Sequence, residues 1–363
     1  MKSRWLKVGK ILKRGKADAL LVINSEESGQ PATKYLSGFS GSSSVLLITK
    51  KKAFLITDSR YTGRAEEEAR EFEVIILKPK ETFSSVLKKL AGKYRLKKIL
   101  IDGDETYFSS IEAIKKAVPE IEIVSKNRTL QELRTVKDKQ EIALLKKAAD
   151  TACKAFLKLL PEIKTGVSEK FLAERLDALC KEEGAEKMAF DTIVASGVNT
   201  ALPHSTPSDK KLKNGELVMI DWGVSYRGYV SDMTRTLAIG KLSTRLRKIY
   251  EAVLEAELLG CLKARAGMTG MELDTVCRDH LTKKGFGKYF THATGHGIGM
   301  EIHELPVIAP KQSAPLPTGA VITCEPGIYI EGVGGVRIED SLLITKTGAI
   351  NLTNQIPKEL LVL

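Results

Sequence analysis

An aspartate inside an apolar strand constrains this chain more than any other feature of its sequence. Residues 217–224 read Leu-Val-Met-Ile-Asp-Trp-Gly-Val, a pattern typical of a buried β-strand, and the run contains Asp221. A charged carboxylate in such a strand is costly unless it has a partner. Asp232 follows in Val-Ser-Asp-Met-Thr-Arg-Thr, beyond a turn expected at residues 225–228. A hairpin with this turn predicts that Asp221 lies directly opposite Asp232, with Cβ atoms ~5 Å apart.

A second pair of acids repeats this pattern downstream. Glu325 lies in Ile-Thr-Cys-Glu-Pro-Gly, and Glu339 lies in Val-Arg-Ile-Glu-Asp, with three glycines between the two segments. A symmetric hairpin about Gly332 predicts that Glu325 lies opposite Glu339. Two carboxylates this close repel each other, so either one is protonated or cations lie between them.

The stretch Thr291–His303 holds three of the five histidines of the chain, and glycines 295, 297 and 299 surround His296. A His-x-x-x-His spacing can present two imidazoles to zinc from one face of a helix. Each of these glycines would cost ~1 kcal/mol inside a helix, so we expect extended or turning backbone instead. Four carboxylates would neutralise two divalent cations. An oxygen-rich site with one imidazole suits Mn²⁺, and Co²⁺ or Zn²⁺ also fits.

Strands alternate with helices in the first third of the chain, which predicts an α/β layer domain. Strands are expected at 17–24, 43–49, 53–57, 72–77, 98–101 and 121–124, and helices at 3–14, 61–70, 82–90 and 109–117. This region contains no G-x-G-x-x-G and no phosphate loop, so we expect no nucleotide site. Residues 126–135 read as a linker, and we place the boundary between two domains, 1–127 and 128–363.

Two similar halves follow the linker, each a helix pair and then antiparallel strands. The first half has helices at 136–164 and 168–184 and strands near 189–196, 216–224 and 228–238. The second has helices at 243–266 and 271–284 and strands near 320–330 and 335–345. The order of elements predicts an α+β domain with an internal pseudo-twofold axis.

Composition and charge exclude several classes of function. The amino end lacks the apolar stretch of a signal peptide, and no apolar run approaches a membrane span, so we expect a cytoplasmic protein without a membrane partner. The five cysteines form no close pair, which favours reduced thiols. The net charge is +12, but the lysines are scattered among glutamates without interleaved aromatic residues. We therefore expect a solvated basic surface and no nucleic-acid partner.

The acids and one histidine together resemble the five metal ligands of the pita-bread metallopeptidases. This family includes methionine aminopeptidases, Xaa-Pro aminopeptidases and Xaa-Pro dipeptidases (prolidases). The resemblance covers the whole second domain and implies the pita-bread fold with two bound divalent metal ions that share a bridging hydroxide. The matching motifs are Ile-Asp-Trp-Gly, Ser-Asp-Met-Thr-Arg-Thr, Gly-His-Gly-Ile-Gly, Glu-Pro-Gly and Arg-Ile-Glu-Asp, with ligands Asp221, Asp232, His296, Glu325 and Glu339.

Further positions match residues that act on substrate in this family. The resemblance implies that His204 lines the substrate site and that His303 contacts the scissile carbonyl. His292 matches a site histidine of the Xaa-Pro enzymes, and Arg337 matches their arginine behind the ligands. Glu325 is implied to act as a proton shuttle as well as a ligand.

The first domain separates the relatives within the family. The segments Tyr35-Leu-Ser-Gly-Phe-Ser-Gly-Ser and Thr57-Asp-Ser-Arg-Tyr are similar to the amino-terminal domain of Xaa-Pro aminopeptidases, which creatinase and prolidases share. In the family this domain often reaches the active site of a neighbour, which implies a homodimer. Archaeal-type prolidases carry an arginine four residues after the match to His303, where this chain has Val307.

The resemblance therefore predicts an Xaa-Pro aminopeptidase acting on peptides with proline in the second position. An Xaa-Pro dipeptidase is the alternative. A non-catalytic binding protein that retains the fold is a more distant one, because such descendants usually lose metal ligands and none is lost here.

Overall fold

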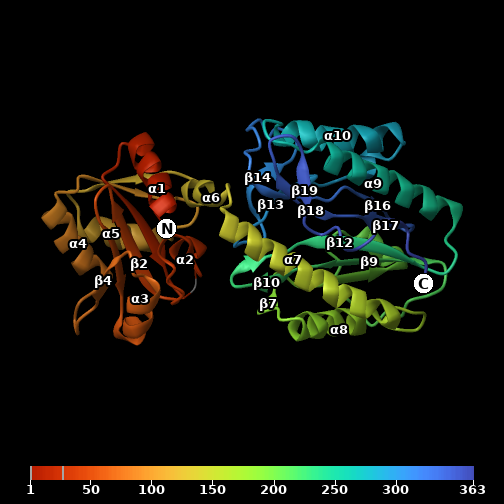
Figure 1. The fold of residues 1–363 in the computed structure, drawn as a ribbon, viewed down its shortest axis with the longest axis horizontal. Helices are drawn as coiled ribbons and strands as arrows, with labels where there is room; N and C mark the ends of the chain where they lie inside the picture. Colours follow the sequence, from red (N-terminus) through yellow and green to blue (C-terminus); the bar gives the residue numbers. More distant parts are fainter. Residues whose placement is uncertain (1, 27) are drawn as a thin grey trace. The chain divides into compact units, whose positions relative to one another are not determined.

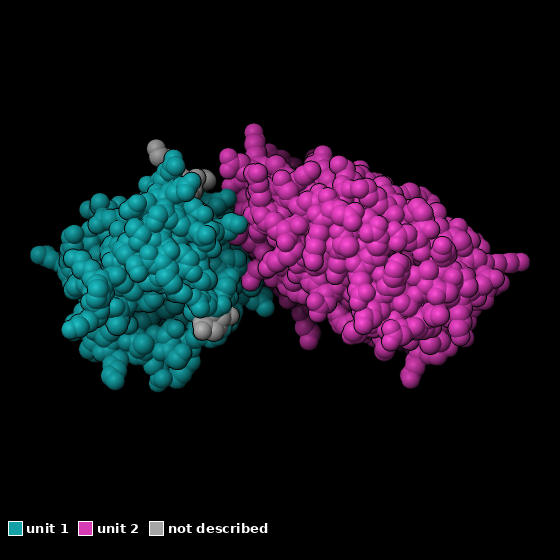
Figure 2. All heavy atoms as spheres, turned by 90° about the horizontal axis from the view of Figure 1, so that it is seen from below, with its two compact units in different colours: residues 1–134 teal, residues 135–363 magenta. Residues whose placement is uncertain are grey.

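The computed structural model describes residues 2–26 and 28–363, which divide into two compact units, residues 1–134 and 135–363 (Figure 2). No helix in the described part of the chain is long and apolar enough to cross a lipid bilayer.

Unit 1 is a six-stranded mixed sheet with helices packed around it. The strand order is β4-β3-β2-β1-β5-β6, with β1 antiparallel to β2 and parallel to β5. All six strands lie where the sequence predicted them: β1 (Ala19–Asn24), β2 (Ser44–Thr49), β3 (Ala53–Thr57), β4 (Glu73–Ile76), β5 (Lys98–Ile101) and β6 (Glu122–Ser125). The helices are α1 (Lys2–Gly15), α2 (Pro31–Ser37), α3 (Thr62–Glu68), α4 (Phe83–Tyr94), α5 (Phe108–Ala117) and α6 (Thr129–Arg134).

Two of these helices were not predicted. Helix α2 has signals that the sequence shows, namely Pro31 at its first position and Gly38 in the left-handed conformation after its end. Helix α6 occupies most of the segment that read as a linker, because Leu130 and Leu133 are buried in unit 1. The Leu133 carbonyl also accepts a hydrogen bond from the Tyr35 hydroxyl at 2.9 Å. The division between the units therefore follows α6, whereas the sequence placed a domain boundary after residue 127.

Unit 2 contains the two predicted halves, each with a pair of helices followed by strands, so the predicted order of elements is confirmed (Figure 1). The first half contains α7 (Lys139–Leu159), α8 (Glu169–Glu182), β7 (Lys187–Met188), β8 (Ile193–Ser196), β9 (Glu216–Trp222), β10 (Val224–Tyr226), β11 (Tyr229–Val230) and β12 (Met233–Ile239). The second contains α9 (Thr244–Lys263), α10 (Gly270–Lys283), β13 (Gly295–Gly297), β14 (Glu304–Ile308), β15 (Val321–Cys324), β16 (Gly327–Ile330), β17 (Gly334–Arg337), β18 (Asp340–Ile344) and β19 (Ala349–Asn351).

Each helix pair of unit 2 covers its own strands with an apolar face. Helices α7 and α8 form one core with β8, β9 and β12, in which Trp222 stacks on Phe156 with ring centroids 4.5 Å apart. The Trp222 indole N–H also donates to the Ala152 carbonyl at 3.1 Å, so its polar atom is satisfied. Helices α9 and α10 form a second core with β15, β16, β17 and β18. Figure 1 shows the two helix pairs on opposite sides of the strands.

The two halves join along β12, and this contact places their acids in one region. Thr234 on β12 forms an isolated antiparallel bridge with Glu339 of the second half. The Arg235 guanidinium donates to the Glu339 carbonyl at 2.6 Å, and the Thr236 hydroxyl donates to the Arg337 carbonyl at 2.8 Å. The strands that carry the two predicted carboxylate pairs therefore meet edge to edge.

Candidate metal centre

The first predicted carboxylate pair shares a face of the hairpin, but its predicted register is wrong. Asp221 on β9 lies opposite Thr234, not opposite Asp232. The hairpin turns at Arg227 and Gly228, whose φ angles of 52° and 80° are those of a two-residue type I′ turn. This tight turn moves the pairing by two residues from the one that a four-residue turn would give. Asp232 comes just before β12 and is a diagonal neighbour of Asp221.

The second predicted pair has the register that the sequence indicated. Gly327 lies opposite Arg337 on one side, and Cys324 lies opposite Asp340 on the other. Between these ladders the strands separate. The Glu325 amide donates to the Thr294 carbonyl at 2.8 Å, and the Glu339 amide donates to the Thr234 carbonyl at 3.1 Å. Both glutamates are thus held by neighbouring segments rather than by each other.

His296 lies at the middle of β13, in the extended backbone that its glycines predicted. A Cβ on Gly295 would lie 2.1 Å from the Thr323 carbonyl oxygen, and one on Gly297 would lie 2.4 Å from the Leu305 carbonyl oxygen. Only glycine therefore allows β13 to pack this closely between its neighbours. The His296 Nε2 atom lies 3.3 Å from Glu325 Oε1 and 3.5 Å from Asp232 Oδ2.

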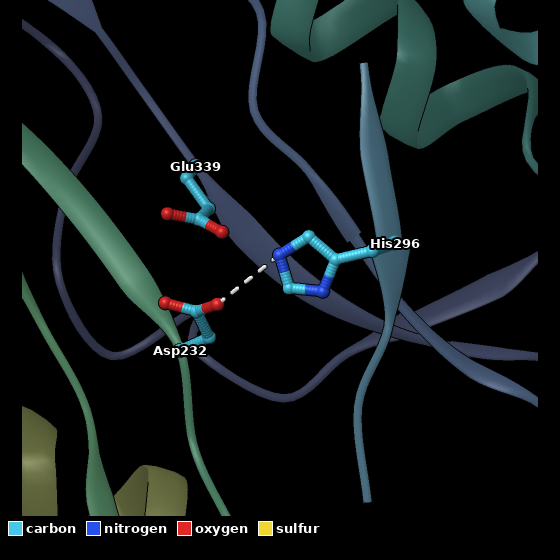
Figure 3. Close-up of side chains that lie close together, drawn as sticks. All are labelled: Asp232, His296 and Glu339. Atoms are coloured by element: carbon cyan, nitrogen blue, oxygen red, sulfur yellow. Dashed lines mark ion pairs between the residues drawn. The ribbon is translucent and has the colours of Figure 1, made fainter. Parts of the chain in front are cut away.

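The side chains of Asp232, His296 and Glu339 point toward one another from three different segments of unit 2 (Figure 3). Their ligand atoms all lie within 4.8 Å of one another. Within residues 2–26 and 28–363, Asp221 Oδ1 and Glu339 Oε1 are buried oxygens without a hydrogen-bond partner. Buried acceptors normally have partners, so these two are suited to a cation. The cluster, with Asp221 and with Glu325 beside His296, therefore has donor groups that fit divalent metal ions.

Burial and mutual repulsion perturb the acids of the centre. Burial, and then the charge of Asp221, raises the pKa of Asp232 well above its usual value. Burial, and then the charge of Asp232, does the same to the pKa of Glu339. The pKa of Asp221 is also raised by burial, although Arg337 opposes the shift. Such crowding is unfavourable with protein groups alone and becomes favourable with positive charge between the carboxylates.

Glu325 and His296 behave differently because they face each other. Burial raises the pKa of Glu325, but the hydrogen bond and charge of His296 outweigh it and bring the pKa to about 2. Burial lowers the pKa of His296, but Glu325 and Asp232 outweigh it and bring the pKa to about 9. An imidazole must be neutral to bind a metal, so metal binding at this centre releases a proton.

Arg337 holds one acid from each half, which gives a structural role to this predicted site residue. Its Nη2 atom donates to Asp221 Oδ2 at 2.6 Å, and its Nε atom donates to the Thr234 hydroxyl at 3.1 Å. That hydroxyl in turn donates to Glu339 Oε2 at 2.7 Å. Burial alone would lower the pKa of Arg337, but Tyr329, Asp221 and the two glutamates raise it further above its usual range.

The three predicted substrate histidines lie beside the centre. The rings of His303 and His296 are 4.4 Å apart, and burial and the charge of His296 lower the pKa of His303. His204 is exposed. Electrostatic repulsion from His204 contributes to the lowered pKa of both His292 and His303.

His292 is engaged within the protein. Its Nδ1 atom lies 2.7 Å from the Ala293 carbonyl, and its Nε2 atom lies 2.9 Å from the Tyr329 hydroxyl. Direct contact of His292 with a substrate would replace one of these bonds.

Tyr329 is a site residue that the sequence analysis missed. Its hydroxyl accepts from Arg337 Nη1 at 2.8 Å and can therefore donate its own hydrogen to His292 Nε2. Burial raises the pKa of Tyr329 to about 12, which keeps this donor protonated. A signal was present, because residues four apart in an extended segment face the same side, and Tyr329 follows Glu325 by four.

Comparisons with known proteins match both parts of the chain to known families. Residues 143–346 match the metallopeptidase family M24, and residues 4–136 match the creatinase/prolidase N-terminal domain. The chain is 37% identical to an Xaa-Pro dipeptidase of Pyrococcus horikoshii, over 97% of both chains. A solved Xaa-Pro dipeptidase from Bacillus anthracis superposes with a TM-score of 0.95 at 38% identity, covering 100% of this chain and 99% of that one. A solved X-Pro aminopeptidase from Thermotoga maritima gives a TM-score of 0.89 at 39% identity, covering 96% and 98%.

Proposed function

The chain belongs to metallopeptidase family M24, and we propose that it is an exopeptidase that uses two divalent metal ions to hydrolyse the bond before a proline. The observation that carries this proposal is the cluster of Asp232, His296 and Glu339. Glu325 lies 3.3 Å from His296, and Asp221 Oδ1 and Glu339 Oε1 are buried oxygens without hydrogen-bond partners in the protein. Hydrolysis fits this arrangement because such a centre supplies what a peptide bond needs, an activated water and a stabilised oxyanion.

The residues that would hold the ions are Asp221, Asp232, His296, Glu325 and Glu339. When bound, two divalent ions supply Lewis acidity and lower the pKa of a water molecule. Mn²⁺ is the ion that we propose, because four of the five ligands are carboxylates, and Co²⁺ or Zn²⁺ would also suit the set.

Two other groups would act on the peptide directly. The Glu325 carboxylate is ionised at neutral pH, so it can take the proton that the attacking water loses and pass it to the leaving nitrogen. The lowered pKa of His303 keeps its imidazole neutral, so one ring N–H can donate to the oxygen that becomes negative in the transition state.

The chemistry of proline explains why a separate class of peptidase is needed for the peptide bond that precedes it. A proline nitrogen carries no hydrogen and its φ angle is fixed, so enzymes that bind the N–H after the scissile bond lose that contact. A site that recognises the ring and the free amino end of the peptide avoids this loss. Relatives named for Xaa-Pro substrates support the same assignment for this chain.

Within this class we favour the Xaa-Pro aminopeptidase. A dipeptidase must bind the terminal carboxylate of its substrate, and this chain has the apolar Val307 where archaeal-type prolidases have an arginine. Arg337 is committed to Asp221, Tyr329 and the Pro203 carbonyl. The dipeptidase remains the second candidate, because relatives with that name are as similar to the chain as the aminopeptidase is.

Three peptides distinguish the candidates. We expect cleavage of an Xaa-Pro-Xaa tripeptide, weaker or no cleavage of Gly-Pro, and none of Met-Ala-Ser. Chelation should abolish the activity, and added Mn²⁺ should restore it. Cleavage of Gly-Pro alone would instead identify a dipeptidase. Absence of all cleavage with Mn²⁺, Co²⁺ and Zn²⁺ would favour a binding protein.

Cytoplasmic location and assembly as a homodimer stay predictions of the sequence. Size-exclusion chromatography with light scattering tests the second of them directly.

Replacing Tyr329 with phenylalanine should lower kcat/KM about tenfold, because it leaves the buried Arg337 Nη1 and His292 Nε2 atoms without their shared partner. Steady-state kinetics on the tripeptide measures this loss. Tyr226→Phe is the control, since Tyr226 lies at the tip of the β10–β11 hairpin, opposite Tyr229. Equal kinetic constants for the two variants would show that the Tyr329 hydroxyl does not contribute to the site.

A further inference from the structure

A buried carboxylate outside the metal centre, that of Glu169, lies at the base of the loop that carries His204. Glu169 is the first residue of α8, and its side chain is fully buried. Its Oε1 atom accepts hydrogen bonds from the Ser196 amide and hydroxyl, both at 2.7 Å, and from Asn199 Nδ2 at 3.1 Å. Its Oε2 atom accepts from the Ser208 hydroxyl at 2.6 Å, the Ser208 amide at 3.2 Å and Asn199 Nδ2 at 3.2 Å.

These bonds connect the two ends of one connection. Residues 196–208 link the end of β8 to the segment that leads into β9, with Ser196 at one end and Ser208 at the other. One carboxylate therefore closes the loop. Backbone bonds reinforce the closure, because the Lys170 amide donates to the Ser208 carbonyl at 3.0 Å and the Glu169 amide donates to the Lys210 carbonyl at 3.1 Å.

The middle of this loop reaches the residues of the centre. The Gly335 amide donates to the Thr200 hydroxyl at 2.7 Å, which fastens the loop to β17. Arg337 Nη1 donates to the Pro203 carbonyl at 3.2 Å, one residue before His204. Leu202 and His204 remain exposed, with 59% of the Leu202 surface accessible. The loop thus holds exposed side chains on an anchored backbone.

We propose that Glu169 is a positioning residue of the peptidase site, which acts by closing the 196–208 loop so that His204 stays beside His292 and His303. This inference rests on the proposed function, in which His204 contacts the bound peptide. A carboxylate suits the role because every group that faces it is a donor, and charge-assisted bonds are stronger than neutral ones. Its place in the first turn of α8 adds the favourable field of a helix amino end.

Glu169→Gln is the sharpest test, since glutamine has the same shape but would turn an NH₂ group toward donors. We expect kcat/KM on the tripeptide to fall by up to ~10²-fold, as loss of positioning typically does. The loss should appear mainly in KM, with unchanged metal content. Glu182→Gln on the same helix is the matched control, because Glu182 is exposed and pairs with Arg175 at 3.4 Å. A kcat/KM for Glu169→Gln within twofold of the parent would overturn the proposal.

A double-mutant cycle separates positioning from a general loss of structure. If Glu169 acts through His204, adding Glu169→Gln to His204→Ala should change kcat/KM little further. Losses that multiply in the double variant would overturn the proposal. Should Glu169→Gln fold poorly, Ser208→Ala removes one of the bonds to Glu169 at the far end of the loop, together with the bond that the Ser208 hydroxyl accepts from the Lys210 amide, and should give a smaller change in the same direction.

Amide hydrogen exchange tests the anchoring without any activity. In Glu169→Gln, residues 197–207 should exchange faster while the second half of α8 keeps its protection. If the parent protein cleaves no peptide, the proposed function is wrong, but hydrogen exchange still tests whether Glu169 anchors the loop. Unchanged exchange in an active enzyme would overturn the anchoring instead.

Discussion

Replacing Asp232 with asparagine, or Glu339 with glutamine, is expected to abolish peptide hydrolysis, with kcat/KM at least ~10³-fold lower. Both residues belong to the cluster whose ligand atoms lie within 4.8 Å of one another. An amide binds divalent cations far more weakly than a carboxylate, so each variant should also lose bound metal. Kinetics and metal content measured on the same preparation test both effects. Full activity of either variant would contradict the proposal of two metal ions.

The same substitutions should stabilise the metal-free protein. Burial and neighbouring charge raise the pKa of both acids in the folded state, so above their usual pKa the unfolded chain ionises more easily than the folded one. This difference destabilises the fold at neutral pH, and a neutral isostere removes it. Thermal unfolding in chelator at pH 7 should show Tm rising by about 2–4 °C for each kcal/mol gained.

The effect of added Mn²⁺ on Tm and a control variant make this test more specific. Adding Mn²⁺ should raise the Tm of the parent protein and have little effect on either variant, because binding stabilises only the state that binds. Asp177→Asn is the matched control, since Asp177 is a partly buried acid bonded to Thr192 at 2.6 Å outside the centre. It should keep full activity. A lower Tm for both ligand variants in chelator would contradict the repulsion that the structure indicates.

Replacing Arg337 with methionine is expected to have the second-largest effect. The substitution should cost about 3–5 kcal/mol of unfolding free energy, because it leaves the buried Asp221 carboxylate without its cation. It also removes donors from the Thr234 hydroxyl, the Tyr329 hydroxyl and the Pro203 carbonyl. Denaturant unfolding in the absence of metal measures the loss. Activity should fall as well, since Asp221 and the His204 loop both lose a contact.

A compensating substitution identifies the cause. Adding Asp221→Asn to Arg337→Met removes the stranded charge and should recover part of the stability, although not the activity. Arg247→Met is the control, because Arg247 is exposed on α9 and its loss should change stability by less than about 0.5 kcal/mol. Equal stability of Arg337→Met and the parent would show that the buried pair is not needed.

Several features of the candidate centre were predictable because they depend on residue types that are close together in the sequence. A carboxylate in an apolar strand, as at Asp221, is visible without a structure because its burial demands a partner. The glycines around His296 likewise exclude a helix through their backbone cost. The second hairpin was placed in register because the glycines near residue 332 mark its turn. These signals depend on residue type and spacing over short distances.

The predictions of the hairpin register and of the linker were wrong because more than one local structure is compatible with the same residues. A four-residue turn and the type I′ turn at Arg227 and Gly228 both close the first hairpin, and they differ by two residues in the partner of Asp221. The segment before Thr135 read as a linker because burial of Leu130 and Leu133 depends on unit 1 being assembled.

The sequence alone thus predicted five metal ligands, the two halves of unit 2 and the kind of chemistry they support. Only the tertiary structure showed that Thr234 bridges to Glu339, that Arg337 binds Asp221 and that Glu169 closes the loop of His204. Thr234 and Glu339 come from different halves of unit 2, and no local pattern relates them. Their meeting depends on how two apolar cores pack, and that is a property of the whole unit rather than of any segment.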